Sequence, residues 1–194
     1  KPSASTAASL LLCSVGLVTW LRAGPLTPPA GPVASSYKTL TEVEPRIAIN
    51  AANTPGDADS LYKITQPGSY YLTGNITGAV DKHGIEVAAS GVTIDLNGFD
   101  LARVPGPGVF GGIKSSVAGL GDIAVKNGTV RNWDAGIDLG SIITTGCRVE
   151  NIRASGNLLD GIWVGVQSVV SGCAVSGGAD GIYSYNESVI SNCS

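Results

Sequence analysis

From residue 84 onward, the chain repeats a short phrase, a glycine followed by alternating apolar and polar side chains. In each repeat an isoleucine points to one side and the next residue to the other, which is the period of two of a half-buried strand. The glycines are successively 28, 24, 25 and 20 residues apart, and variable spacing around a constant strand predicts the stacked turns of a β-solenoid. Five segments carry this phrase: His83–Val87, Gly111–Ser115, Ala135–Leu139, Asp160–Val164 and Asp180–Ser184.

A second apolar and polar alternation lies between consecutive phrases. Asn and Gly separate the segments, as in Asn97-Gly98 and Asn127-Gly128, where a positive φ costs little. A turn of two or three short strands buries its apolar face only by stacking on the next turn. We therefore predict an all-β fold, a right-handed parallel β-helix. The second strands expected are Val92–Leu96, Ile123–Lys126, Cys147–Glu150 and Cys173–Ser176.

Residues 1–36 are predicted to precede the folded domain. The apolar run Ser9–Leu21 has the length of a signal-peptide core and is shorter than the roughly 20 residues of a membrane span. The segment Gly24–Pro32 contains four prolines and is typical of an extended spacer. We therefore expect a secreted or cell-surface protein that contacts a membrane only through the signal segment.

The rest of the chain divides into a cap and repeats. Residues 37–66 are predicted to form an N-terminal cap, because an uncovered first turn would expose strand edges and core. Residues 67–194 are predicted to be the parallel β-helix repeats. Since Ser191–Ser194 begins another turn without a polar cap, we expect the repeats to be truncated here, with C-terminal turns missing.

Composition agrees with a solenoid and argues against one class of partner. The 27 glycines in 194 residues are about twice the ~7% typical of globular chains. Charge is sparse and slightly acidic, with 12 Lys and Arg against 15 Asp and Glu. Because no basic stripe exists, we expect no nucleic-acid partner. The length suits one elongated domain, and we expect a monomer.

Three segments resemble a known family. Ile64–Ile76, Gly84–Val87 and Gly91–Phe99 resemble the opening coils of secreted bacterial right-handed parallel β-helix repeat proteins of the pectate-lyase-like superfamily. The resemblance implies a right-handed helix of parallel strands and a habit of handling acidic polysaccharides. It implies no single reaction, since that superfamily spans lyases, hydrolases, epimerases, tailspikes and adhesins.

The catalytic motifs of that superfamily are absent from residues 1–194. The single histidine lies in Lys82-His83-Gly84, outside any Gly-His-Gly, and Arg103-Val104-Pro105 lacks the second arginine of the lyase pattern. The enzyme question therefore stays open between polysaccharide lyase, glycoside hydrolase and no reaction, and the catalytic residues are unknown.

The residue after each isoleucine is the candidate for binding. If the isoleucines face the core, the following side chains stack outward on one sheet, and their aromatic members offer a shelf for a sugar ring. The candidate substrate-binding residues are Trp163, Tyr183, Tyr185, Asp138, Glu86 and Lys114. Alternatively the charged members form cross-strand pairs, and the rings lie under a loop or meet another subunit.

No cofactor is expected except calcium as an open alternative. Asp134, Asp160 and Asp180 each stand just ahead of a Gly-Ile pair or of Ala-Gly-Ile, and aligned carboxylates would suit calcium. Ordinary turn chemistry explains the same residues, because Asp before Gly is common in turns.

The cysteines are candidates for a structural ladder. Cys147, Cys173 and Cys193 are expected at the same place in three successive turns, as buried free thiols. Neighbouring turns are about 4.8 Å apart, so a disulfide between two of them is the alternative.

Two functions from different classes follow. The first is an exported protein that binds, or degrades, a polysaccharide or cell-surface glycan along the Trp163 face. The second is a non-enzymatic surface or adhesive solenoid that serves as a rigid spacer.

Overall fold

The computed structural model of the protein describes residues 44–141 and 143–194. The predicted signal segment and linker (1–36) and the first residues of the predicted cap (37–43) lie outside the described residues. Every regular element described is a β-strand. In this part of the chain no helix has the length and hydropathy needed to cross a bilayer.

The strands are short and follow one another at nearly regular intervals. They are β1 (Ile47–Ala48), β2 (Ser60–Ile64), β3 (Gly68–Tyr71), β4 (Ile76–Thr77), β5 (His83–Val87), β6 (Val92–Asp95), β7 (Asp100–Ala102), β8 (Gly111–Ser115), β9 (Ala124–Arg131), β10 (Ala135–Asp138), β11 (Arg148–Ser155), β12 (Asp160–Val164), β13 (Val169–Ser171), β14 (Ala174–Ser176), β15 (Asp180–Ser184) and β16 (Val189–Ser191).

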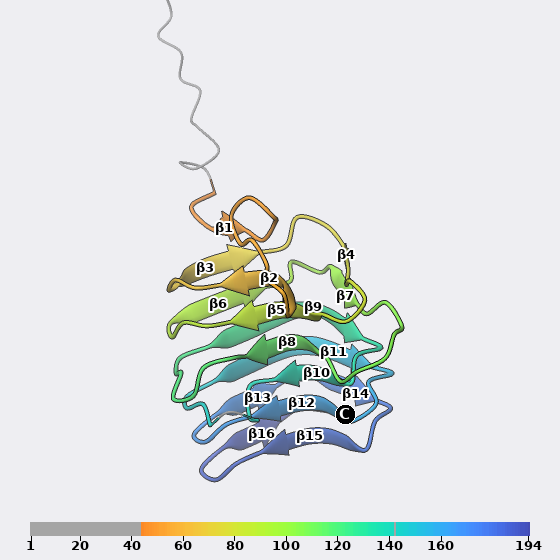
Figure 1. Ribbon diagram of the computed structural model, residues 1–194. Helices are drawn as coiled ribbons and strands as arrows, with labels where there is room; N and C mark the ends of the chain where they lie inside the picture. The colour runs from red at the N-terminus through yellow and green to blue at the C-terminus, as the bar shows by residue number, and fades with distance from the viewer. Residues whose placement is uncertain (1–43, 142) are drawn as a thin grey trace, which may run out of the picture. The chain divides into compact units, whose positions relative to one another are not determined.

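Parallel pairing between successive turns builds two sheets. The six-stranded sheet has the order β15-β12-β10-β8-β5-β2, with one strand from each turn. The ten-stranded sheet follows β1-β3-β6-β9-β11-β13-β16, with β4, β7 and β14 pairing beside this path. Figure 1 shows the turns stacked from β1 to β15 and β16. The predicted all-β parallel solenoid is confirmed, with about six turns.

The ten-stranded sheet supplies two faces of each turn because its long strands bend. Asn127 in β9 and Asn151 in β11 have φ angles of 58° and 52° and lie at the bend. The first halves of β9 and β11 pair with one another, and the second halves form a separate ladder that continues to β14. Asparagine suits the bend because it adopts the left-handed region more readily than most residues.

The repeated isoleucines form the core of the six-stranded sheet. Ile85, Ile113, Ile137 and Ile162 stand directly above one another and are fully buried. Burying one such side chain contributes about 1.5–3 kcal/mol relative to leaving it exposed. The inward alternation that the sequence predicts is therefore the main source of stability along this face.

The glycines of the repeated phrase lie where the backbones of stacked turns come close together. None of these five glycines, all in the described part of the chain, has a positive φ. A Cβ on Gly84, Gly112 or Gly136 would lie 2.4, 2.6 or 2.5 Å from the carbonyl oxygen of the equivalent glycine in the next turn. Glycine is needed here because the backbones of stacked turns approach one another closely.

The solenoid begins inside the segment that the sequence assigns to the cap. Strand β2 pairs in parallel with β5, so the first turn starts at Ser60. Before it, β1 pairs with β3 and extends the ten-stranded sheet by one short strand. Described residues ahead of Ser60 therefore cover part of the first turn, and Ser60–Ile64 belongs to the repeats.

The predicted three-membered cysteine ladder is wrong for one member. The hydroxyl of Ser168 accepts a hydrogen bond from the Cys147 backbone N–H at 3.2 Å, which places Ser168 and not Cys173 beside Cys147 in the next turn. Cys173 instead lies next to Cys193, since Ser171 pairs with Ser191 two residues earlier. All three are free, and Cys147 and Cys173 are buried as expected.

Candidate functional site

Strand register places the predicted outward residues in one column. The column runs along the six-stranded sheet from the first turn to the last described turn, and Lys63 precedes the predicted members. Its residues are Lys63, Glu86, Lys114, Asp138, Trp163 and Tyr183, each directly opposite the next. The column changes character along its length, from charged in β2 to β10 to aromatic in β12 and β15.

Glu86 is held by protein partners. Its carboxylate contacts Lys63 Nζ at 2.6 Å, and only 5% of the residue is exposed. Burial raises the pKa of Glu86, but hydrogen bonds from Lys63 and Ser116 outweigh burial, so the pKa lies below its ordinary value. This carboxylate is ionised and satisfied, as the cross-strand alternative predicts, although its partner is Lys63 and not Lys114.

Asp138 is likewise hydrogen-bonded within the protein, to Ser141 of its own turn. One carboxylate oxygen accepts the Ser141 backbone N–H at 2.9 Å, and the other accepts the Ser141 hydroxyl at 2.7 Å. Lys114 Nζ lies 3.8 Å away, and 7% of Asp138 is exposed. Of the three charged residues predicted to border a sugar shelf, Glu86 and Asp138 are therefore buried, and only Lys114 is partly exposed.

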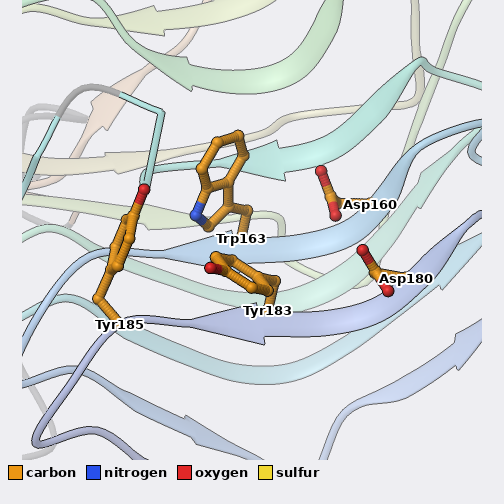
Figure 2. A pocket seen from close by; sticks show the side chains of 5 residues that line it. All are labelled: Asp160, Trp163, Asp180, Tyr183 and Tyr185. Carbon is orange, nitrogen blue, oxygen red and sulfur yellow. The ribbon is translucent and has the colours of Figure 1, made fainter.

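The aromatic end of the column forms a cluster of three rings. Trp163 and Tyr183 are edge to face, with ring centroids 5.7 Å apart and an interplanar angle of 82°. Tyr185 lies 5.7 Å from Tyr183 and 6.2 Å from Trp163. Tyr183 is 44% exposed and Tyr185 36% exposed, whereas Trp163 is partly buried. Figure 2 shows the three rings gathered on the outer face of β12 and β15.

The position of the Trp163 ring is set by packing against its neighbours. A Cβ added to Gly140 would lie 2.1 Å from Trp163 Cδ1 and 2.2 Å from Nε1, so the indole rests on the bare backbone of the preceding turn. The indole N–H is buried and has no hydrogen-bond partner among the described residues. Packing against Gly140 and the tyrosines therefore fixes the ring, with no polar contact from its nitrogen.

Two carboxylates complete the site. A surface hollow of about 390 Å³ is lined by the three aromatic residues together with Asp160 and Asp180. These two aspartates are paired in register on β12 and β15, and Figure 2 shows their side chains one above the other beside the rings. Neither forms an ion pair with any residue between 44 and 194 that the structure describes.

Sequence reasoning did not join Asp160 and Asp180 to the aromatic shelf. Counting back by twos from Ile162 places Asp160 on the core side. At the corner, however, the alternation breaks: a Cβ on Gly161 would lie 2.2 Å from the side chain of Val175, which packs against the core, so the glycine points inward. Asp160 is thereby turned outward beside Trp163. The repeated Asp-Gly-Ile at positions 160 and 180 was the available signal.

The column of three aspartates that the calcium alternative requires does not form. Ile137 is opposite Ile162, so Ala135 and not Asp134 occupies the level of Asp160. Asp134 is instead buried, where it pairs with Arg103 and accepts the Phe110 backbone N–H at 2.6 Å. Across 44–141 and 143–194, no group of three His, Cys, Asp or Glu residues is arranged to hold a metal ion.

The carboxylates in and beside the hollow lie close enough to repel one another. Burial, followed by the charges of Asp180 and Asp138, raises the pKa of Asp160 above its ordinary value. A group that donates hydrogen bonds or carries positive charge would relieve this repulsion. The site can therefore offer a ligand two aromatic ring faces, which attract C–H groups, and two carboxylates, which accept hydrogen bonds.

Comparison of the chain with protein-family models, with curated proteins and with solved structures finds no match in any of the three. Any function of this chain must therefore be inferred from the residues of the site itself.

Proposed function

We propose that this chain is an exported β-solenoid that binds polysaccharide at the hollow lined by Trp163, Tyr183 and Tyr185. The observation that carries the proposal is the cluster itself: three rings within 5.7–6.2 Å of one another, two of them more than a third exposed. Large exposed aromatic groups beside convergent polar groups are typical of ligand sites. The proposal covers binding and assigns no reaction.

The shape and chemistry of the site suit a sugar. A pyranose presents C–H bonds on its faces and hydroxyl groups around its rim. The C–H groups would lie against the negative faces of Tyr183 and Tyr185, and the rim hydroxyls would donate to Asp160 and Asp180. The hollow is open at the surface beside β12 and β15, so one sugar unit of a chain can reach it.

Export and membership of the pectate-lyase-like group belong to the same proposal. The apolar run Ser9–Leu21 supports export, and the opening-coil resemblance together with the solenoid fold supports the family. In this proposal the charged half of the column stabilises the sheet, since Glu86 and Asp138 are already satisfied by protein partners.

The test is a binding screen of the purified protein against neutral, acidic and amino polysaccharides by affinity gel electrophoresis. Tyr183→Ala and Trp163→Ala should each weaken binding at least fivefold, about the effect of losing a central aromatic contact. Tyr71→Ala is the matched control, because Tyr71 lies on the other sheet, beneath Arg46. A folded protein that binds none of the polysaccharides would favour the structural or adhesive solenoid instead.

A further inference from the structure

Among the described residues that line it, the hollow beside the aromatic cluster has negative charge and no positive charge. Of its five lining residues, two are aspartates and three are aromatic. Asp160 and Asp180 stand opposite one another on neighbouring strands, whose backbones are about 4.8 Å apart. Two carboxylates at this spacing repel one another when both are ionised.

The nearest cation of the column does not neutralise this pair. Asp138, on β10, is adjacent to β12 and adds a third carboxylate on the same side. Lys114 contacts Asp138 at 3.8 Å, but it belongs to β8, on the far side of β10 from the hollow. An anionic sugar in the hollow would therefore meet two carboxylates, and no ammonium group among the described lining residues.

Aromatic faces next to carboxylates favour one kind of ligand group. An organic ammonium is attracted to the negative face of a tyrosine or tryptophan ring, and to a carboxylate. Burial, followed by the charges of Asp180 and Asp138, raises the pKa of Asp160. A cation in the hollow would be stabilised by Asp160 and Asp180, neither of which has an ion-pair partner among the described residues.

We infer that the hollow selects amino sugars: its ligand is a polysaccharide with free ammonium groups, bound with the ammonium between Asp160 and Asp180 and the ring on Tyr183. The inference rests on the proposed polysaccharide binding and specifies its substrate class. It departs from the acidic polysaccharides that the family resemblance implies, because the charge of this hollow opposes them.

The experiment compares three oligosaccharides of equal length by isothermal titration calorimetry at neutral pH and low salt. They are an oligomer of glucosamine, one of N-acetylglucosamine and one of galacturonic acid. We expect the glucosamine oligomer to bind about tenfold more tightly than the N-acetylated one, from cation–π and ion-pair contacts together. Galacturonate should bind weakest.

Two double variants test the assignment to the hollow. Asp160→Asn/Asp180→Asn should bring the glucosamine preference down to about twofold or less, with neutral binding retained. Asp59→Asn/Glu150→Gln removes the same net charge from an exposed turn and from the other sheet, and should leave the preference unchanged. Tyr183→Ala should weaken binding of both hexosamine oligomers.

The outcomes separate this inference from the proposed function. Equal or tighter binding of the N-acetylated or acidic oligomer, lost in Tyr183→Ala, would overturn the ammonium assignment and leave polysaccharide binding standing. A glucosamine preference that both double variants reduce equally would reflect the general negative charge of the protein and would also overturn it. A folded protein that binds none of the three would overturn the ammonium assignment, and the broader polysaccharide screen would then decide the proposed function.

Discussion

The indole of Trp163 rests on the backbone of Gly140, where a Cβ would approach Trp163 Cδ1 to 2.1 Å. This contact joins β12 to the end of β10 and sets the height of the ring above the sheet. The exposed tyrosines pack on Trp163, so the shape of the aromatic cluster depends on one glycine that is not among the residues lining the hollow.

Gly140→Ala should therefore displace the indole and weaken polysaccharide binding while leaving the fold intact. We expect a loss of about fivefold or more in affinity, comparable to removal of a ring, with the far-ultraviolet circular dichroism spectrum unchanged. Gly74→Ala is the matched control, because a Cβ there meets no atom within 4 Å. Equal affinity in the two variants would show that the position of Trp163 is irrelevant to binding.

Lys63→Ala should destabilise the first two turns. The substitution leaves Glu86 buried without its cation and with Ser116 as its remaining side-chain donor, and losing a partner of a buried charged acceptor costs about 1–3 kcal/mol. Urea unfolding measures the change. Lys126→Ala is the control, since Lys126 is more exposed and contacts Asp95 only at 3.9 Å, an arrangement worth about 0–1 kcal/mol. Adding Glu86→Gln to Lys63→Ala should restore part of the stability, because the buried group is then neutral.

His83 should make stability depend on pH. Its Nδ1 accepts the Gly111 backbone N–H at 2.8 Å, so the folded state holds the imidazole neutral. Burial, followed by the charge of Lys114, lowers the pKa of His83 below 6.5, against smaller opposing effects of Glu86, Asp138 and Asp59. A depressed folded pKa stabilises the protein above the unfolded pKa, and this contribution is lost as pH falls through 6.5 toward the folded value.

Urea unfolding of the wild type and of His83→Gln at several pH values tests this dependence. Between about pH 7.5 and about pH 5.5 the wild type should lose up to about 1 kcal/mol more stability than the variant, whose side chain does not titrate. Parallel pH profiles for the two proteins would exclude His83 as the group responsible.

The cysteines should differ in reactivity. Burial raises the pKa of Cys147 and of Cys173, which further protects both thiols, whereas Cys193 is partly exposed. Among the three cysteines that the structure describes, brief alkylation of the native protein, followed by peptide mass mapping, should modify Cys193 first and leave Cys147 and Cys173 until urea is added. Modification of Cys147 at the rate of Cys193 would contradict the burial described here.

Much of the register was predictable because one face of each strand is buried. The isoleucine after each repeated glycine identifies the core side without ambiguity, and a shift of one residue would expose the whole apolar set. The column from Glu86 to Tyr183 follows from that choice. The pairing of the second strands was harder to predict. The segment Cys173–Ser176 has the same pattern as Cys147–Glu150, yet its strand β14 pairs with the second half of β11.

The sequence by itself determined the solenoid, its core isoleucines and the column that ends in Trp163 and Tyr183, because strand alternation is a local property with a period of two. Only the tertiary structure decided what happens at the corners and between the turns. There the inward Gly161 turns Asp160 toward the aromatic rings. Glu86 forms its ion pair with Lys63 and not with Lys114, and the indole of Trp163 packs on Gly140. These relationships join residues of different turns through backbone bends, and the bends obey no fixed period along the chain.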